Sequence, residues 1–175
     1  VLTNEVEADL AALHVYASRA YGTSGTTPFG SGLGETANIR KLLVDNGAPT
    51  SDLNLVMNTS AGANLRTLTQ LTKVNAAGDS SMLRQGVLLD IHGMALRESA
   101  QIVTSTAGTG ASATTNTAGY AIGATVITLA SAGTGTIVAG DVITFAGDTN
   151  KYVVASGDAD VSNGGTITLA APGLR

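Results

Sequence analysis

The stretch GVLLDIHGMALRES, residues 86–99, decides how the first part of this chain folds. Its first half is crowded with apolar residues, as buried strands are. Its second half alternates apolar and polar side chains with the period of a half-buried strand. Gly93 separates the two halves, as a turn residue does. We therefore expect a pair of strands around Gly93, a structural segment where an enzyme could carry a catalytic loop.

Before this stretch, the sequence predicts a long first helix. Asn4 is a candidate N-cap, Glu7 follows it with the spacing of a capping box, and Gly22 is expected to end the helix. Apolar side chains recur at steps of three and four, at Val6, Leu10, Leu13, Ala17 and Tyr21. We expect this stripe to face a core, and a face that binds a partner is the alternative.

Further elements are expected between the first helix and the stretch 86–99. A helix over Ala37–Val44 is followed by Gly47 and Pro49, which are residues that end helices. The alternation over Leu53–Met57 predicts a short strand. The segment Ala61–Leu71 predicts a helix with leucines 65, 68 and 71 on one side. Residues 80–86 are expected to form a turn or a short helix.

The composition changes after residue 102, which predicts a domain boundary. Residues 1–102 contain seven basic and nine acidic residues, whereas residues 103–175 contain two and four and are rich in Gly, Thr, Ala and Val. Ser105–Asn116 has the composition of a linker. Four runs rich in Val, Ile and Thr then predict strands, at 125–129, 142–145, 151–154 and 166–169. Their spacing suits a small barrel or sandwich, and four strands leave open edges.

Within this β-rich part, four apolar residues are expected to share one core: Ile127, Val142, Phe145 and Leu169. If the Phe145 ring is buried there, replacing it by Ala should cost about 3–5 kcal/mol of stability. An unchanged melting temperature would remove Phe145 from the core.

The composition of the whole chain excludes several classes of function. The 175 residues have a formal net charge of −4, with 9 basic and 13 acidic residues, a poor balance for binding nucleic acid. The sequence contains no Cys, which excludes disulfides, thiolate metal sites and cysteine nucleophiles. It contains no apolar run of about 18 residues that could span a membrane. We therefore expect neither a nucleic-acid partner nor a membrane partner.

The two histidines, His14 and His92, are candidates for catalysis or metal binding. Apart from Asp90, no carboxylate lies near either histidine at metal-ligand spacing, so we expect a structural role for both. A serine hydrolase of the elbow type would need a Gly-x-Ser-x-Gly motif, and none occurs. The loop Gly30–Gly34 suggests a phosphate cradle, but it lacks the spacing and the following Lys-Ser/Thr, which favours a flexible surface loop.

Two pairs of aspartates are candidates for binding or catalytic groups. Asp158 and Asp160 resemble the start of a calcium loop, but the sixth position is not Gly and the twelfth is not Glu, so a polar hairpin turn is expected. Asp141 and Asp148 flank the run 142–145, and each follows a Gly, so turns are expected there too. We therefore expect no catalytic residue, no metal ligand and no residue that binds a cofactor.

Long segments of the chain resemble the major capsid (coat) proteins of tailed bacteriophages, in the branch with a β-rich insertion domain. The segments are LTNEVEADLAALHVYASRAY (2–21), LVDNGAPTS (43–51), SAGANLR (60–66), GDSSMLRQGVLLDIHGMALRES (78–99) and residues 119–160. The resemblance covers nearly the whole chain.

This resemblance implies an α+β fold, namely a fragment of the tailed-phage capsid fold. Residues 1–21 would be the spine helix, and residues 35–102 would lie in the axial domain, so the first domain is expected at 1–102. Residues 103–175 would form an incomplete, barrel-like, all-β insertion domain. The family's extended arm and cross-linking loop would precede residue 1. Because the chain lacks a starting Met and stops at Arg175, we expect a proteolytic fragment.

The function implied by the resemblance is structural and not enzymatic: self-assembly into the icosahedral head shell of a phage or prophage. The partners would be other copies in capsomers and, for the full-length protein, scaffolding and portal proteins. The location would be the virion, after synthesis in the cytoplasm of the bacterial host. A β-rich, adhesin-like surface module is the alternative, and the helical patterns of residues 1–71 count against it. A hydrolase is a third class of function, which the missing catalytic constellation disfavours. Turnover of ester or glycoside substrates by the purified protein would support it.

Overall fold

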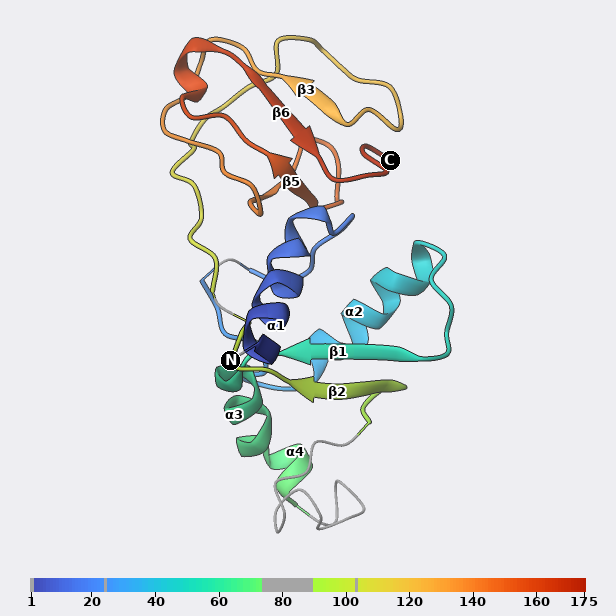
Figure 1. The fold of residues 1–175 in the computed structure, drawn as a ribbon. Coiled ribbons are helices and arrows are strands. Elements are labelled where there is room, and N and C mark those ends of the chain that lie inside the picture. The colour runs from blue at the N-terminus through green and yellow to red at the C-terminus, as the bar shows by residue number, and fades with distance from the viewer. Residues whose placement is uncertain (1, 24, 74–89, 103) are drawn as a thin grey trace. The chain divides into compact units, whose positions relative to one another are not determined.

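The computed structural model describes residues 2–23, 25–73, 90–102 and 104–175, and its fold is mixed α+β (Figure 1). These residues form four α-helices, a two-stranded parallel sheet and a four-stranded antiparallel sheet. The chain divides into two compact units. The helical unit comprises Val1–Glu7 and Tyr21–Val103, and the β unit comprises Ala8–Ala20 and Thr104–Arg175. Residues 8–20 thus group with the β-rich part of the chain.

The first helix, α1, covers Leu2–Ala12, and a 3-10 turn over Leu13–Tyr16 follows it. The predicted cap Asn4 lies inside α1, and Gly22 lies well past its end, so both predicted limits are wrong. The 3-10 turn contacts strand β5, Tyr152–Ser156, within the β unit. Because residues distant in sequence make this contact, the local periodicity could not show where the helix ends.

The apolar stripe of this segment is exposed, so its predicted burial in a core is wrong. The exposed fractions are 50% for Val6, 62% for Leu10, 55% for Leu13 and 49% for Tyr21, and Ala17 is exposed as well. The described part of α1 has no buried residue. A role for the stripe in binding a partner remains a prediction.

Helix α2 covers Gly34–Asp45 and contains the predicted helix 37–44. It ends as the sequence predicts. Gly47 adopts a φ of 85°, a left-handed conformation that a residue with a Cβ rarely takes, and its N–H donates to Val44 O. The next N–H, of Ala48, donates to Leu43 O, so the last turn of the helix is closed by backbone bonds.

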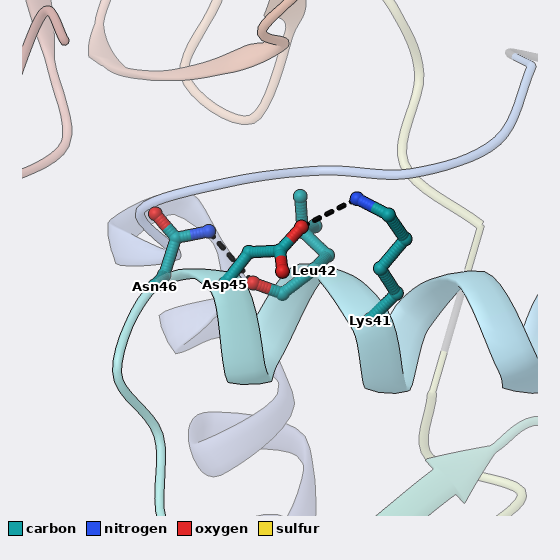
Figure 2. Close-up of polar contacts among 4 residues, drawn as sticks. All are labelled: Lys41, Leu42, Asp45 and Asn46. Atoms are coloured by element: carbon teal, nitrogen blue, oxygen red, sulfur yellow. Dashed lines mark hydrogen bonds and ion pairs between the residues drawn. The ribbon is translucent and has the colours of Figure 1, made fainter.

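Figure 2 shows the side chains around the end of α2. Lys41 Nζ lies 2.5 Å from Asp45 Oδ2, in an ion pair between residues four positions apart. Asn46 Nδ2 donates to Leu42 O at 2.7 Å, a carbonyl that also accepts the backbone N–H of Asn46 at 3.2 Å.

The predicted helix 61–71 is present as two helices, α3 over Thr59–Thr67 and α4 over Thr69–Thr72. Asn58 caps α3, because its side-chain oxygen accepts a hydrogen bond from the N–H of Ala61 at 2.9 Å. Leu68, between the two helices, is extended. Leucines 65, 68 and 71, which the sequence places on one side of the predicted helix, are all buried.

The small sheet pairs β1, Leu53–Met57, with β2, Met94–Glu98, in parallel. The predicted bounds of β1 are confirmed to the residue. The presence of a strand in the second half of the stretch 86–99 is confirmed as well. The backbone of Ile91 and Met94 exchanges two hydrogen bonds of 3.0 Å around His92 and Gly93. Both predictions for residues 80–89, the turn and the first strand, lie outside the described residues.

The core of the helical unit gathers side chains from the loop before α2, from α3 and α4, and from both strands. Its buried members are Phe29, Met57, Ala61, Leu65, Leu68, Leu71, Ile91 and Leu96.

The β unit is built on a four-stranded antiparallel sheet in the order β3-β6-β5-β4. The outer strands are β3, Val126–Thr128, and β4, Val142–Ile143, and the inner strands are β6, Thr166–Leu169, and β5. All four predicted strands are present, some of them shorter than expected. The sheet is not closed into a barrel, so the barrel-like form is wrong.

The predicted common core of the β unit is confirmed for Ile127 and Leu169, which are buried. Val142 is 48% exposed, so its predicted place in the core is wrong. It lies on β4, an edge strand of the sheet. The Phe145 side chain is half-buried and packs edge-on against the ring of Tyr152, with 5.7 Å between the ring centroids.

The segment predicted as a linker, Ser105–Asn116, is paired with the β unit instead. Ala111 and Thr134 exchange two backbone hydrogen bonds, and Asn116 N donates to Thr128 O at 3.1 Å. Small residues are needed there, because a Cβ on Gly108 would lie 2.4 Å from Thr136 O. A composition rich in Gly, Ser and Thr therefore serves close backbone packing here.

Candidate functional site

His92, on the turn before β2, is the sequence candidate with the most developed surroundings. Its Nδ1 lies 2.7 Å from the Oγ1 of Thr36, a residue of α2 with 0% exposure. Thr36 Oγ1 also lies 2.7 Å from Leu33 O. The hydroxyl has one hydrogen, and a carbonyl oxygen can only accept, so Thr36 donates to Leu33 and accepts from His92 Nδ1. The buried hydroxyl therefore fixes the orientation of the imidazole.

Arg40, one turn further along α2, lies against the same turn. Its Nη1 donates to the carbonyl oxygen of His92 at 2.9 Å. Gly93 follows with a φ of 73°, and a Cβ on it would lie 2.6 Å from Arg40 Nη1. A shallow, open hollow of about 420 Å³ is lined by Ala37, Arg40, His92 and Gly93. We call this feature the Arg40–His92 hollow.

His14 has no comparable setting. It is exposed in the 3-10 turn, and its Nδ1 lies 3.0 Å from Ala11 O, so that nitrogen donates to the backbone. His14 belongs to the β unit and His92 to the helical unit. In the part of the chain that the structure describes, no group of three or more His, Cys, Asp or Glu side chains is placed to hold a metal ion.

The aspartates of the β unit accept hydrogen bonds from nearby turns. Asp141 accepts from the N–H of Gly108 and from the N–H of Val138, at 3.0 and 2.8 Å. Asp158 Oδ1 accepts from Asp160 N, and Asp160 caps the 3-10 turn Val161–Asn163. The Ser162 hydroxyl bond to Asp160 lowers the pKa of that carboxyl group, which favours its charged form.

Asp148 and Tyr152 form the closest side-chain contact of this unit. Tyr152 Oη donates to Asp148 Oδ2 at 2.5 Å, and the N–H of Asn150 donates to Oδ1 at 2.8 Å. The Tyr152 bond is the main cause that lowers the pKa of Asp148. Burial is the main cause that raises the pKa of Tyr152. These shifts keep the carboxylate charged and the phenol neutral, the states that the hydrogen bond needs.

Two arginines also lie in defined polar settings. Arg66 Nη2 is 2.6 Å from Glu98 Oε2, which joins α3 to β2. That bond is the main cause that raises the pKa of Arg66 and lowers the pKa of Glu98. Arg19 lies over the ring of Tyr152 at 4.9 Å, and its Nη1 donates to Gly173 O at 3.3 Å. Neither contact is visible in the sequence, because Glu98 lies 32 residues from Arg66 and Gly173 lies 154 residues from Arg19.

The glycine-rich loop Gly30–Gly34 leads into α2. Phe29, just before the loop, has a φ of 64° and is buried in the core of the helical unit. Gln70 of α4 lies beside Gly32, 3.8 Å from the position that a Cβ would occupy. The loop therefore packs against its own unit.

Comparisons of the chain with protein-family models, with curated proteins and with solved structures found no match. None of the helices in the described ranges is long and apolar enough to cross a membrane.

Proposed function

We propose that this chain is part of the major capsid protein of a tailed bacteriophage or prophage. In this role it assembles with identical copies into the icosahedral head shell and makes or breaks no covalent bond. The resemblance of the segments 2–21, 43–51, 60–66, 78–99 and 119–160 to such coat proteins suggests this function.

The observation that carries the proposal is a row of exposed apolar side chains along α1 and the 3-10 turn, the α1 stripe. Its members and their exposed fractions are Leu2 78%, Val6 50%, Leu10 62%, Leu13 55% and Tyr16 66%. They follow one another at steps of three or four residues, so they share one side of the segment. Contiguous exposed apolar surface of this kind marks protein–protein contact sites. A shell subunit provides the matching partner, because its copies meet through repeated contacts.

The partners in this proposal are other copies in the capsomers, together with scaffolding and portal proteins for the full-length form. The protein would reside in the virion after synthesis in the host cytoplasm. The β unit would belong to an outward-facing insertion domain, and no specific contact with nucleic acid is proposed.

The helices of the helical unit favour a shell subunit over an adhesin-like module. An adhesin built of β repeats has strands throughout, whereas α3 and α4 supply Ala61, Leu65 and Leu71 to the core of this unit. The four-stranded sheet of the β unit is compatible with either function, so it does not decide between them.

The test is expression of the full-length protein that contains this chain, with its scaffolding partner, followed by electron microscopy. Closed shells are expected for the wild type, and Leu10→Glu should abolish them, because it places a charge in the middle of the α1 stripe. Ile122→Glu is the matched control, because Ile122 is 84% exposed and lies outside the stripe. Absence of shells from the wild type, or normal shells from Leu10→Glu, would contradict the proposal.

A further inference from the structure

We propose that the Arg40–His92 hollow binds a carboxylate side chain of a second copy of this chain. The inference rests on the proposed function, since it supplies one polar contact between subunits of a shell. It concerns a surface of the helical unit that the α1 stripe does not include.

The guanidinium of Arg40 is held in place before any partner arrives. Its Nη1 donates to His92 O at 2.9 Å and lies 2.6 Å from the position that a Cβ on Gly93 would occupy. Among the described residues, no Asp or Glu side chain forms an ion pair with Arg40. The ion pairs found there join Lys41 to Asp45 and Arg66 to Glu98. A guanidinium presents paired N–H groups that match the two oxygens of a carboxylate.

A two-residue turn forms the other wall of the hollow. His92 and Gly93 have φ values of 51° and 73°, positive at both central positions as in tight hairpin turns. The backbone hydrogen bonds between Ile91 and Met94 close this turn. Here the Thr36 hydroxyl, fully buried, holds the imidazole, and Arg40 holds the carbonyl. The wall is therefore rigid, and binding would cost little ordering.

The charge of the chain favours a carboxylate from another copy as the occupant. The sequence has 13 acidic residues and 9 basic ones, so every copy carries more carboxylates than cations. Because the hollow is shallow and open, it suits the tip of a side chain better than a whole small molecule.

The test measures self-association of the full chain by sedimentation velocity over a range of protein concentrations. Arg40→Gln should weaken association at least tenfold, whereas Arg97→Gln, which removes the same charge from an exposed residue of β2, should leave it unchanged. Ala37→Glu should weaken it as strongly, because it fills the hollow with the chain's own carboxylate and keeps Arg40. In a parallel NMR titration, sodium acetate should shift the amide signal of Gly93 in the wild type and not in Arg40→Gln.

Three results would overturn this inference: a wild type that stays monomeric, equal association of Arg40→Gln and Arg97→Gln, or no response of Gly93 to acetate. Ala37→Glu covers the case in which Arg40→Gln fails to fold. The shell assay separates this inference from the proposed function. Shells that form equally well with Arg40→Gln would refute the carboxylate site alone, and absence of shells from the wild type would refute the proposed function.

Discussion

At the scale of single residues, Tyr152 joins three interactions of the β unit. Its ring packs against Phe145 and lies under the guanidinium of Arg19, and its hydroxyl donates to Asp148. The side chain is 1% exposed, so its apolar area is removed from water while its polar end is satisfied. A buried aromatic ring with a paired hydroxyl stabilises the sheet without leaving an unpaired donor.

The first prediction concerns the partial burial of Phe145. Because its side chain is only half-buried, Phe145→Ala should cost clearly less than the roughly 3–5 kcal/mol typical of a fully buried Phe. Ile127→Ala, at a residue with 0% exposure, should cost about 2–5 kcal/mol and serves as the comparison. Val142→Ala should change stability by about 0.5 kcal/mol or less. Urea denaturation measures all three, and equal losses for Val142→Ala and Ile127→Ala would contradict the assignment of the core.

The second prediction concerns the Arg66–Glu98 ion pair and its dependence on pH. The pKa of Glu98 in the folded protein lies below the ordinary value of 4.5, so the pair contributes its full stability above pH 4.5. This contribution is lost as the pH falls through the lower folded pKa. Glu98→Gln should therefore destabilise the protein near pH 7, by about 1 kcal/mol or less because the pair is partly exposed. The difference from the wild type should vanish in acid.

The control for this ion pair is the more exposed pair at the end of α2. Lys41 and Asp45 are 72% and 51% exposed, so Asp45→Asn should cost no more than about 0.5 kcal/mol. Thermal unfolding at pH 7 and at pH 3 measures both variants. A difference between Glu98→Gln and the wild type that persists unchanged at pH 3 would show that the side chain acts through packing and not through its charge.

At the scale of elements, the α1 stripe and the core helix α3 differ most clearly. Both segments carry apolar residues at helical spacing. In α3, Ala61 and Leu65 are buried beneath α4 and the strands, whereas the described residues of α1 include no buried one. Amphipathic spacing thus identifies a face that needs a partner, but not whether that partner lies in the same chain.

The third prediction follows from this difference. Leu10→Gln should change the stability of the isolated chain by about 0.5 kcal/mol or less, because the side chain is already in water. Leu65→Ala, at a residue with 0% exposure, should cost about 2–5 kcal/mol. Differential scanning calorimetry of the two variants compares them directly. A large loss from Leu10→Gln would mean that α1 packs in the free protein through its stripe.

At the scale of the whole molecule, the chain crosses between its two units more than once. Residues 8–20 belong to the β unit, although 83 residues of the other unit separate them from Thr104. Arg19 is one of the residues that fasten this segment, through its contact with Tyr152 and its bond to Gly173 O. The β unit is therefore completed by a segment from the start of the sequence.

The fourth prediction tests this completion. Arg19→Ala removes a cation–π contact and a hydrogen bond, and should destabilise the β unit by about 1–2 kcal/mol. The loss is tempered because Arg19 Nε is buried without a partner, which is a cost of the native state. Amide hydrogen exchange should accelerate in β5 and β6 and stay unchanged in β1 and β2. Arg97→Ala is the control, and equal acceleration in both units would refute the assignment of residues 8–20 to the β unit.

Elements whose signals lie within a few neighbouring residues could be predicted from the amino-acid sequence. Period-two alternation located β1 to the residue, and Gly47 marked the end of α2. These features depend on backbone propensity and side-chain periodicity within a few residues. Of the residues that line the hollow, the sequence drew attention to His92, for which a structural role was expected, and to Gly93, which was expected to separate two strands.

Only the tertiary structure decided the features that depend on residues distant in sequence. The end of α1, the exposure of Val142 and the pairing of the segment 105–116 all follow from which surface each element meets. The Arg40–His92 hollow is of the same kind, because Thr36 and Arg40 lie more than fifty residues from the turn that they support. Close packing and hydrogen-bond geometry act between neighbours in space, and a one-dimensional pattern does not contain those neighbours.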